Sequence, residues 1–181
     1  EKRKEKFINE IDQNKIYKPI KYILNNGGKR IRPCLVLLSV EMFDGVIEKN
    51  IDQAFAIELF HNFTLLHDDI MDEAPLRRGK KTVHTKWDIN KAILSGDIMF
   101  AMANSLMINC DEKYCSKVMS IFNQTAIEIC EGQDMDMDFE NREDVSVEEY
   151  LEMIRLKTSV LLACSLKIGA ITSGANKNDI D

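Results

Sequence analysis

The sequence predicts an all-α fold. Its 181 residues include only three prolines and eight glycines, too few for a β-sandwich with its many tight turns. Methionine, leucine, isoleucine, glutamate and lysine are plentiful, a balance that suits helices. Apolar residues recur at helical spacing in six segments, and several of these are apolar over much of their surface. These observations indicate an antiparallel helical bundle in which outer helices cover the central ones.

The six helical segments follow one another along the whole chain. They span residues 7–24, 31–42, 51–71, 89–108, 112–140 and 147–173. Turn-forming residues separate two pairs of segments, at 25–28 and at 75–81, and the polar stretch 174–181 predicts a loop. Because no repeat or linker interrupts the pattern, we expect a single domain over residues 1–181.

Charge and composition argue against several classes of protein. The 24 Lys and Arg against 30 Asp and Glu give a net charge of −6, which disfavours nucleic-acid binding. No apolar run approaches the roughly 20 residues of a membrane span, and no signal-peptide core is present, so a cytoplasmic protein is expected. Five cysteines without a Cys-x-x-Cys pair indicate reduced, mostly packed side chains.

An acidic cluster lies at the end of the third segment. At 3.6 residues per turn, Asp68 and Asp72 are offset by about 40° and about 6 Å, so their carboxylates share one helix face. Negative charge is unfavourable at a helix C-terminus, and a divalent metal would reverse that cost. Mg²⁺ takes one or two protein carboxylates and completes its shell with water and phosphate oxygens. The alternative is an acidic, solvated helix end.

Basic clusters occur on both sides of the acidic one. Arg77 and Arg78 follow it closely, and guanidinium groups bind phosphate oxygens in pairs. An acidic pair that faces an arginine pair therefore suits a metal-bound polyanion such as a diphosphate. The alternative is that Arg77 and Arg78 only neutralise Asp72 and Glu73.

The earlier basic cluster, residues 27–33, begins with two glycines that allow a tight turn. We expect the next helix to carry three cations in its first turn, Lys29, Arg30 and Arg32. Backbone N–H groups and cations together make an anion site, and a solvated helix start is the alternative.

His61 lies seven residues before Asp68, about 20° around the helix and about 10 Å along it. Both side chains can therefore face one cavity at different depths, so one helix could serve two substrates. A core or surface histidine bonded to backbone is the alternative, and we assign that role to His67 and His84.

Together these motifs resemble the trans-isoprenyl diphosphate synthases, also called polyprenyl synthetases. The order and spacing agree with that family for Gly28-Lys29-Arg30-Ile31-Arg32-Pro33, His61, Asp68-Asp69-Ile70-Met71-Asp72 and Arg77-Arg78-Gly79. Residues 131–136 and 157–159 also match, so the similarity extends from about Tyr17 to Gly174. The resemblance implies the isoprenoid synthase fold, an antiparallel bundle around a central cavity, and a homodimer.

The resemblance also implies a reaction, in which an allylic diphosphate condenses with isopentenyl diphosphate and diphosphate is released. Asp68 and Asp72 would bind Mg²⁺ that bridges the allylic diphosphate. The family pattern assigns isopentenyl diphosphate to Lys29, Arg32, His61 and Arg78, and the allylic side to Arg77, Gln133, Lys157 and Thr158. From the residues alone, Lys157 is an ordinary helical lysine, and Asp134, Asp136 and Asp138 form an acidic helix face.

Bulky side chains just before the aspartate motif limit product length in this family. Phe63 and Thr64 stand five and four residues before Asp68, which resembles enzymes that make farnesyl to geranylgeranyl products. Phe63 lies about 140° around an ideal helix from Asp68, whereas Thr64 is nearly aligned with it. The limit could therefore depend on a neighbouring helix or subunit.

One motif of the family is missing, and Lys81 replaces a common proline. The family carries a second aspartate-rich motif on a later helix. We therefore expect the N-terminal portion of a longer synthase, truncated before that helix and inactive alone. Two other functions stay open: a noncatalytic helical partner subunit, and a His-Asp phosphohydrolase in which His61 or His84 would assist a His67-Asp68 metal pair.

Overall fold

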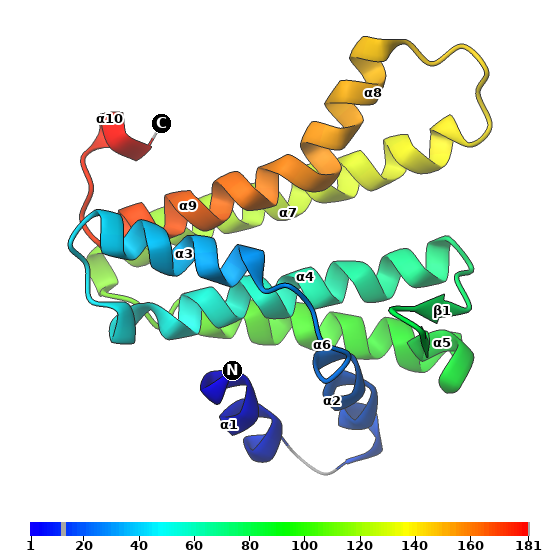
Figure 1. The fold of residues 1–181 in the computed structure, drawn as a ribbon, viewed down its shortest axis with the longest axis horizontal. Coiled ribbons are helices and arrows are strands. Elements are labelled where there is room, and N and C mark those ends of the chain that lie inside the picture. The colour runs from blue at the N-terminus through cyan, green and yellow to red at the C-terminus, as the bar shows by residue number, and fades with distance from the viewer. Residues whose placement is uncertain (12–13, 181) are drawn as a thin grey trace. The chain divides into compact units, whose positions relative to one another are not determined.

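The computed structural model describes residues 1–11 and 14–180 (Figure 1). Its elements are α1 (Lys2–Glu10), η1 (Lys15–Tyr17), α2 (Lys18–Leu24), α3 (Ile31–Met42), η2 (Ile47–Asn50), α4 (Ile51–Met71), β1 (Leu76–Arg77), β2 (Lys80–Lys81), α5 (Val83–Lys86), α6 (Ile89–Met107), α7 (Glu112–Phe139), α8 (Val147–Ile154), η3 (Arg155–Ser159), α9 (Val160–Thr172) and α10 (Lys177–Ile180). The all-α prediction is confirmed, since strands in the described residues form only the short β1–β2 hairpin.

Contacts divide the chain into two compact units. The first combines Glu1–Pro33 with Ile51–Asn109, and the second combines Cys34–Asn50 with Cys110–Asp181. The expectation of one domain over the whole chain stays a prediction.

The first unit is built on α4 and α6, which lie side by side and run in opposite directions (Figure 1). Every residue of α4 from Gln53 to Phe60 is buried, as expected of a helix that is apolar on most sides. The buried amide of Gln53 donates to the carbonyl of Leu106 at 3.3 Å, which satisfies a polar group inside this packing.

In the second unit, α7 and α9 run antiparallel (Figure 1), and α3 packs on α9. The hydroxyl of Ser39 donates to the carbonyl of Leu166 at 2.7 Å. A Cβ at Gly169 would lie 2.3 Å from the carbonyl oxygen of Val36, so only glycine allows α3 and α9 to approach this closely.

Two expectations about element boundaries were wrong, those for segment 7–24 and for the tail. Segment 7–24 is not one helix, because α1 ends at Glu10 and α2 begins at Lys18 with Pro19 in its first turn, where proline is favoured. The turn at 75–81 contains the hairpin. The tail carries α10, whose Ile180 is buried, and the side chain of Asn176 caps it by accepting from the Asp179 N–H at 3.2 Å.

None of the described helices combines the length and the apolar character that a membrane crossing requires. No disulfide bond is assigned to any of the five cysteines, but the expectation that most are packed was wrong. Only Cys164 is buried, whereas Cys34 and Cys130 are exposed.

Candidate active site

The acidic cluster continues α4 by one residue. The helix ends at Met71, and the backbone N–H of Asp72 donates to the carbonyl of Asp68 at 2.9 Å. Asp68 and Asp72 therefore keep the offset of about one turn that the sequence predicts. Asp69 is only 3% exposed, whereas Asp72 is exposed. The cluster thus combines the buried carboxylate of Asp69 with the partly exposed one of Asp68 and the exposed one of Asp72.

Arg77 joins the hairpin to this cluster. Its Nε donates to Asp69 at 2.6 Å, and its Nη2 donates to Asp68 at 3.0 Å. Burial raises the pKa of Asp69, although the hydrogen bond and charge of Arg77 lower it. Strand β1 thus directs this guanidinium to Asp68 and Asp69, whereas the alternative from the sequence paired it with Asp72 and Glu73.

Arg78 is directed elsewhere by the turn of the hairpin. Leu76 pairs with Lys81 and Arg77 with Lys80, which leaves Arg78 and Gly79 as the two turn residues. Their φ values of 53° and 75° are both positive, as a type I′ turn requires. Arg78 consequently donates to the carbonyl of Gly27, far from the acidic cluster in sequence.

A pocket of about 490 Å³ adjoins Arg78. It is lined by Gly28, Lys29, Arg30, Ile31, Arg32, Glu58, His61 and Arg78. The pocket thus brings together the four side chains that the sequence resemblance assigns to one diphosphate. Four cationic side chains face a single carboxylate, Glu58, so the pocket suits a multiply charged anion.

His61 is a neutral member of this pocket. Burial, together with the charges of Arg32, Arg78, Arg77 and Arg30, lowers its pKa to about 3. The neutral imidazole can accept a hydrogen bond from Arg32, whose Nη1 lies 3.2 Å from its Nε2. Burial also lowers the pKa of Arg32. Among the described residues the buried Nε of Arg32 has no hydrogen-bond partner, so this donor can bind an anionic ligand.

The loop before α3 corrects one expectation. The helix begins at Ile31, so Lys29 and Arg30 precede it and only Arg32 lies in its first turn. Arg30 has φ 55° and Gly28 has φ 149°. A Cβ at Gly28 would lie 2.9 Å from a guanidinium nitrogen of both Arg30 and Arg78. The positive φ therefore favours glycine here, and the missing side chain leaves room for the two guanidinium groups.

Phe63 and His67 face α6. The ring of Phe63 stacks on Phe100, with centroids 5.3 Å apart, and meets His67 edge-on at 4.7 Å. The Nε2 of His67 lies 3.2 Å from the carbonyl oxygen of Ile93, and a Cβ at Gly96 would lie 2.2 Å from the same nitrogen. This packing supports the expected backbone-bonded histidine and argues against a His67-Asp68 metal pair.

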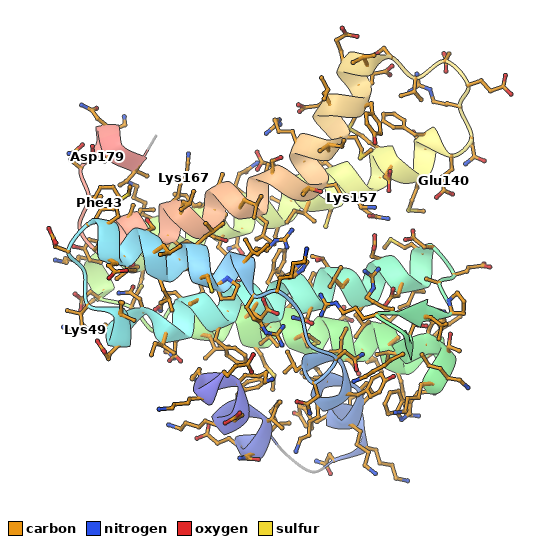
Figure 2. All side chains as sticks on the ribbon, in the orientation of Figure 1. Phe43, Lys49, Glu140, Lys157, Lys167 and Asp179 are labelled. Carbon is orange, nitrogen blue, oxygen red and sulfur yellow. The ribbon has the colours of Figure 1, made fainter. Side chains whose placement is uncertain are left out.

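The remaining predicted site residues, Gln133, Lys157 and Thr158, belong to the second unit. Lys157 lies in the π-helical turn η3, alongside α7 (Figure 2). Its ammonium pairs with Asp136 at 2.5 Å, so Asp136 is not simply part of a solvated acidic face. The buried Nε2 of Gln133 has no partner among the described residues.

The helical period alone did not reveal η3. A Cβ at Gly132 would lie 2.4 Å from the backbone nitrogen of Lys157, so glycine allows α7 to approach the π-helical turn. Such turns are frequent at functional sites, and here the turn carries both Lys157 and Thr158.

Glu58 and Asn62 were not predicted to belong to the site, and Arg30 was predicted only as one of three cations before Pro33. The carboxylate of Glu58 accepts hydrogen bonds from Arg30 and from Asn62. One feature of the sequence could have revealed Glu58, which is a charged residue in an otherwise apolar helical segment. An acidic side chain is rarely buried unless it is paired, so a partner for Glu58 could have been expected.

Asp68 and Asp72 are the carboxylates that can hold a metal. Among the described residues there is no group of three or more His, Cys, Asp or Glu suited to a metal ion. Two carboxylates one turn apart nevertheless fit Mg²⁺, because this ion prefers oxygen donors and completes its shell with water and substrate phosphates.

Comparison with known proteins agrees with this geometry. The family model "Polyprenyl synthetase" matches residues 13–181. Geranylgeranyl diphosphate synthase of Methanosarcina mazei is 44% identical over 163 residues, which cover 89% of this chain and 50% of that protein. The chain thus spans about half the length of the curated relatives it matches.

Solved structures extend the similarity to three dimensions. A geranylgeranyl pyrophosphate synthase matches with a TM-score of 0.95 at 49% identity, over 99% of this chain and 55% of that one. The geranylgeranyl pyrophosphate synthetase of Geoglobus acetivorans matches with a TM-score of 0.93 at 43% identity, over 97% of this chain and 58% of that one. The sequence motifs, the helical fold and both comparisons agree that this chain belongs to the polyprenyl synthetase family.

Proposed function

We propose that the full-length protein is a trans-prenyltransferase that condenses isopentenyl diphosphate with an allylic diphosphate and releases diphosphate. One observation carries the proposal: α4 presents His61 to a cationic pocket and Asp68 to an acidic cluster, and the β1–β2 hairpin gives one arginine to each. Such an arrangement suits two phosphorylated substrates, of which only one is bound through a metal.

Isopentenyl diphosphate occupies the cationic pocket in this proposal. Lys29, Arg32 and Arg78 provide positive charge, and the unsatisfied Nε of Arg32 provides a buried donor. His61 contributes a neutral ring that orients Arg32 rather than an additional charge. The alkene of the bound substrate is then left to attack the allylic carbon.

The allylic diphosphate binds at the acidic end of α4. Mg²⁺ bound to Asp68 and Asp72 would supply the positive charge that stabilises the departing diphosphate. Arg77 exchanges Asp68 for a phosphate oxygen while it remains paired with the buried Asp69. The resemblance to the family also assigns Gln133, Lys157 and Thr158 to this substrate, and the amide of Gln133 has an unsatisfied donor available for such a contact. No protein base is required, because the released diphosphate can accept the final proton.

We further propose that the products are all-trans chains of farnesyl to geranylgeranyl length. Relatives named geranylgeranyl diphosphate synthases support this range. The homodimer and the cytoplasmic location expected from the sequence are also part of the proposal.

The direct test is incubation of the full-length protein with Mg²⁺, isopentenyl diphosphate and geranyl or farnesyl diphosphate, followed by chromatography of the dephosphorylated products. Longer prenyl alcohols that require both substrates are expected. A phosphohydrolase would instead release phosphate without the alkene acceptor, and a noncatalytic subunit would yield neither result. Either of these outcomes would refute the proposal.

Arg78→Ala will weaken the binding of isopentenyl diphosphate far more than the binding of the allylic substrate. We expect its KM for isopentenyl diphosphate to rise roughly 10- to 100-fold, because a hydrogen bond to a charged group contributes about 1.5–3 kcal/mol. Lys80→Ala, an exposed cation in the same hairpin, is the control and should change this KM less than twofold. Initial rates with each substrate varied in turn measure the effect, and equal losses for both substrates would contradict the assignment.

Phe63→Ala will lengthen the products by one or more five-carbon units if this ring closes the cavity for the growing chain. Its stacking on Phe100 places it against α6, where loss of the ring opens space. Thr64→Ala tests the second position, since the Thr64 hydroxyl bonds only locally, to the carbonyl of His61 at 2.9 Å. Chromatography of the products measures their chain lengths. Identical chain lengths in the wild type and in Phe63→Ala would rule out Phe63 as the residue that limits product length.

A further inference from the structure

Glu58 is the one carboxylate among the side chains that line the cationic pocket, and it is only 6% exposed. Its Oε1 accepts from Nη1 of Arg30 and from the amide of Asn62 at 3.0 Å. Asn62, itself 1% exposed, also donates to the carbonyl of Glu58 at 2.7 Å. The carboxylate is therefore oriented from two directions, which offsets the cost of burying its charge.

Arg30 is occupied by protein partners rather than open to a ligand. Besides Glu58, its guanidinium lies 3.3 Å from the carbonyl of Gly27 and 3.4 Å from the carbonyl of Leu24. Its φ of 55° lies in a region that most side chains avoid. Arg30 thus connects the end of α2, the glycine loop and α4 through a single side chain.

The same loop positions a cation of the pocket. Arg78 donates to the carbonyl of Gly27, the group that Arg30 also contacts. The missing side chain of Gly28 leaves room for both guanidinium groups, each 2.9 Å from the position of a Cβ. Arg30 and Arg78 therefore share the Gly27 carbonyl as an acceptor.

Glu58 also acts on Arg32 through its charge. Burial lowers the pKa of Arg32, and the negative charge of Glu58 opposes that effect. Since Glu58 lies one helical turn before His61, the helix brings its charge close to the Arg32–His61 contact.

We propose that Glu58 and Arg30 form a positioning pair, which fixes the glycine loop so that Arg32 and Arg78 converge on the diphosphate of isopentenyl diphosphate. In this proposal both members line the pocket but act through Arg32 and Arg78. The proposal rests on the proposed function and extends it, because it assigns the specificity of the pocket to two residues that orient its other cations.

The test is a set of four full-length proteins: wild type, Glu58→Gln, Arg30→Gln and the double variant. Each single change should raise the KM for isopentenyl diphosphate about tenfold, while kcat and the KM for the allylic diphosphate change less than about threefold. The double variant should be no worse than the worse single one, because coupled residues are non-additive. Glu152→Gln is the matched control, since the pair of Glu152 with Arg155 at 2.6 Å is exposed.

The outcomes separate this proposal from the proposed function. A wild-type protein without prenyl transfer refutes the proposed function whatever the variants do. An active wild type with an unchanged KM in Glu58→Gln overturns the positioning pair, and so does an equal rise in both KM values. If circular dichroism shows that Glu58→Gln is unfolded, Arg30→Lys decides, because an ammonium keeps the charge but lacks the planar fork. An unchanged KM in Arg30→Lys would then overturn the proposal.

Discussion

Asp68→Ala or Asp72→Ala in the full-length protein will reduce magnesium-dependent prenyl transfer by about 10³-fold or more. The two carboxylates are one turn apart at the end of α4, and removing either one removes half of the protein donors of the proposed Mg²⁺ site. A loss of about 4 kcal/mol of charge stabilisation in the transition state corresponds to roughly this factor in kcat. Far-UV circular dichroism should stay close to that of the wild type, because both residues lie at the end of the helix.

The measurement is kcat at several Mg²⁺ concentrations. Partial recovery at high Mg²⁺ is expected for a weakened metal site. Asp111→Ala is a suitable control, because Asp111 is an exposed acidic residue whose side chain makes no capping bond to α7. Unchanged turnover in either motif variant would refute the metal-binding role.

Arg77→Ala will lower the free energy of unfolding by about 2–3 kcal/mol. Removal of the guanidinium leaves Asp69, 3% exposed, without its ion-pair partner and takes a hydrogen bond from Asp68. Breaking a buried pair costs about 3–5 kcal/mol, and the partial exposure of Arg77 reduces that figure. Thermal unfolding should shift by roughly 5–10 °C, and prenyl transfer should fall as well if Arg77 contacts the allylic diphosphate.

The pH dependence of the free energy of unfolding tests whether Asp69 is the source of that loss. Burial already raises its pKa above 3.8 in the folded wild type, and loss of Arg77 raises it further. A carboxyl with a raised folded pKa holds its proton longer in the folded state, so stability falls as the pH rises from about 4 toward that pKa. Arg77→Ala should therefore be closest to the wild type in urea unfolding near pH 4 and furthest from it near neutral pH.

Arg142→Ala provides the matched control. Arg142 also contacts two carboxylates, those of Asp144 at 3.1 Å and Glu149 at 3.0 Å, but on an exposed surface. Exposed pairs contribute about 0–1 kcal/mol. Equal destabilisation by the two arginine changes would contradict the importance of the buried Asp69.

The helices were largely predictable because their signals are local. The periodic segments 31–42 and 51–71 coincide with α3 and α4, and two further segments end within one residue of α6 and α7. The failures also have local physical reasons. Pro19 breaks the first segment, since proline favours a helix start. The π-helical turn η3 packs closely on Gly132, and helical periodicity does not record such a contact.

The residues of the candidate site were also visible in the sequence, but their partners were not. From the sequence, Arg77 and Arg78 were predicted to act together as one basic pair. The hairpin separates them, because its positive-φ turn begins between them. Arg77 consequently contacts Asp68 and Asp69, whereas Arg78 reaches the carbonyl of Gly27.

The sequence by itself determined the all-α class, the shared helix face of Asp68 and Asp72, and the family to which the motifs point. Each of these depends on helical period or on residue order, which are properties of the chain alone. Only the tertiary structure decided that His61 is neutral, that Asp69 is buried and that Glu58 binds Arg30, 28 residues away in sequence. Burial and counter-charge come from segments that folding brings together. They lower the pKa of His61, raise the pKa of Asp69 and orient the carboxylate of Glu58.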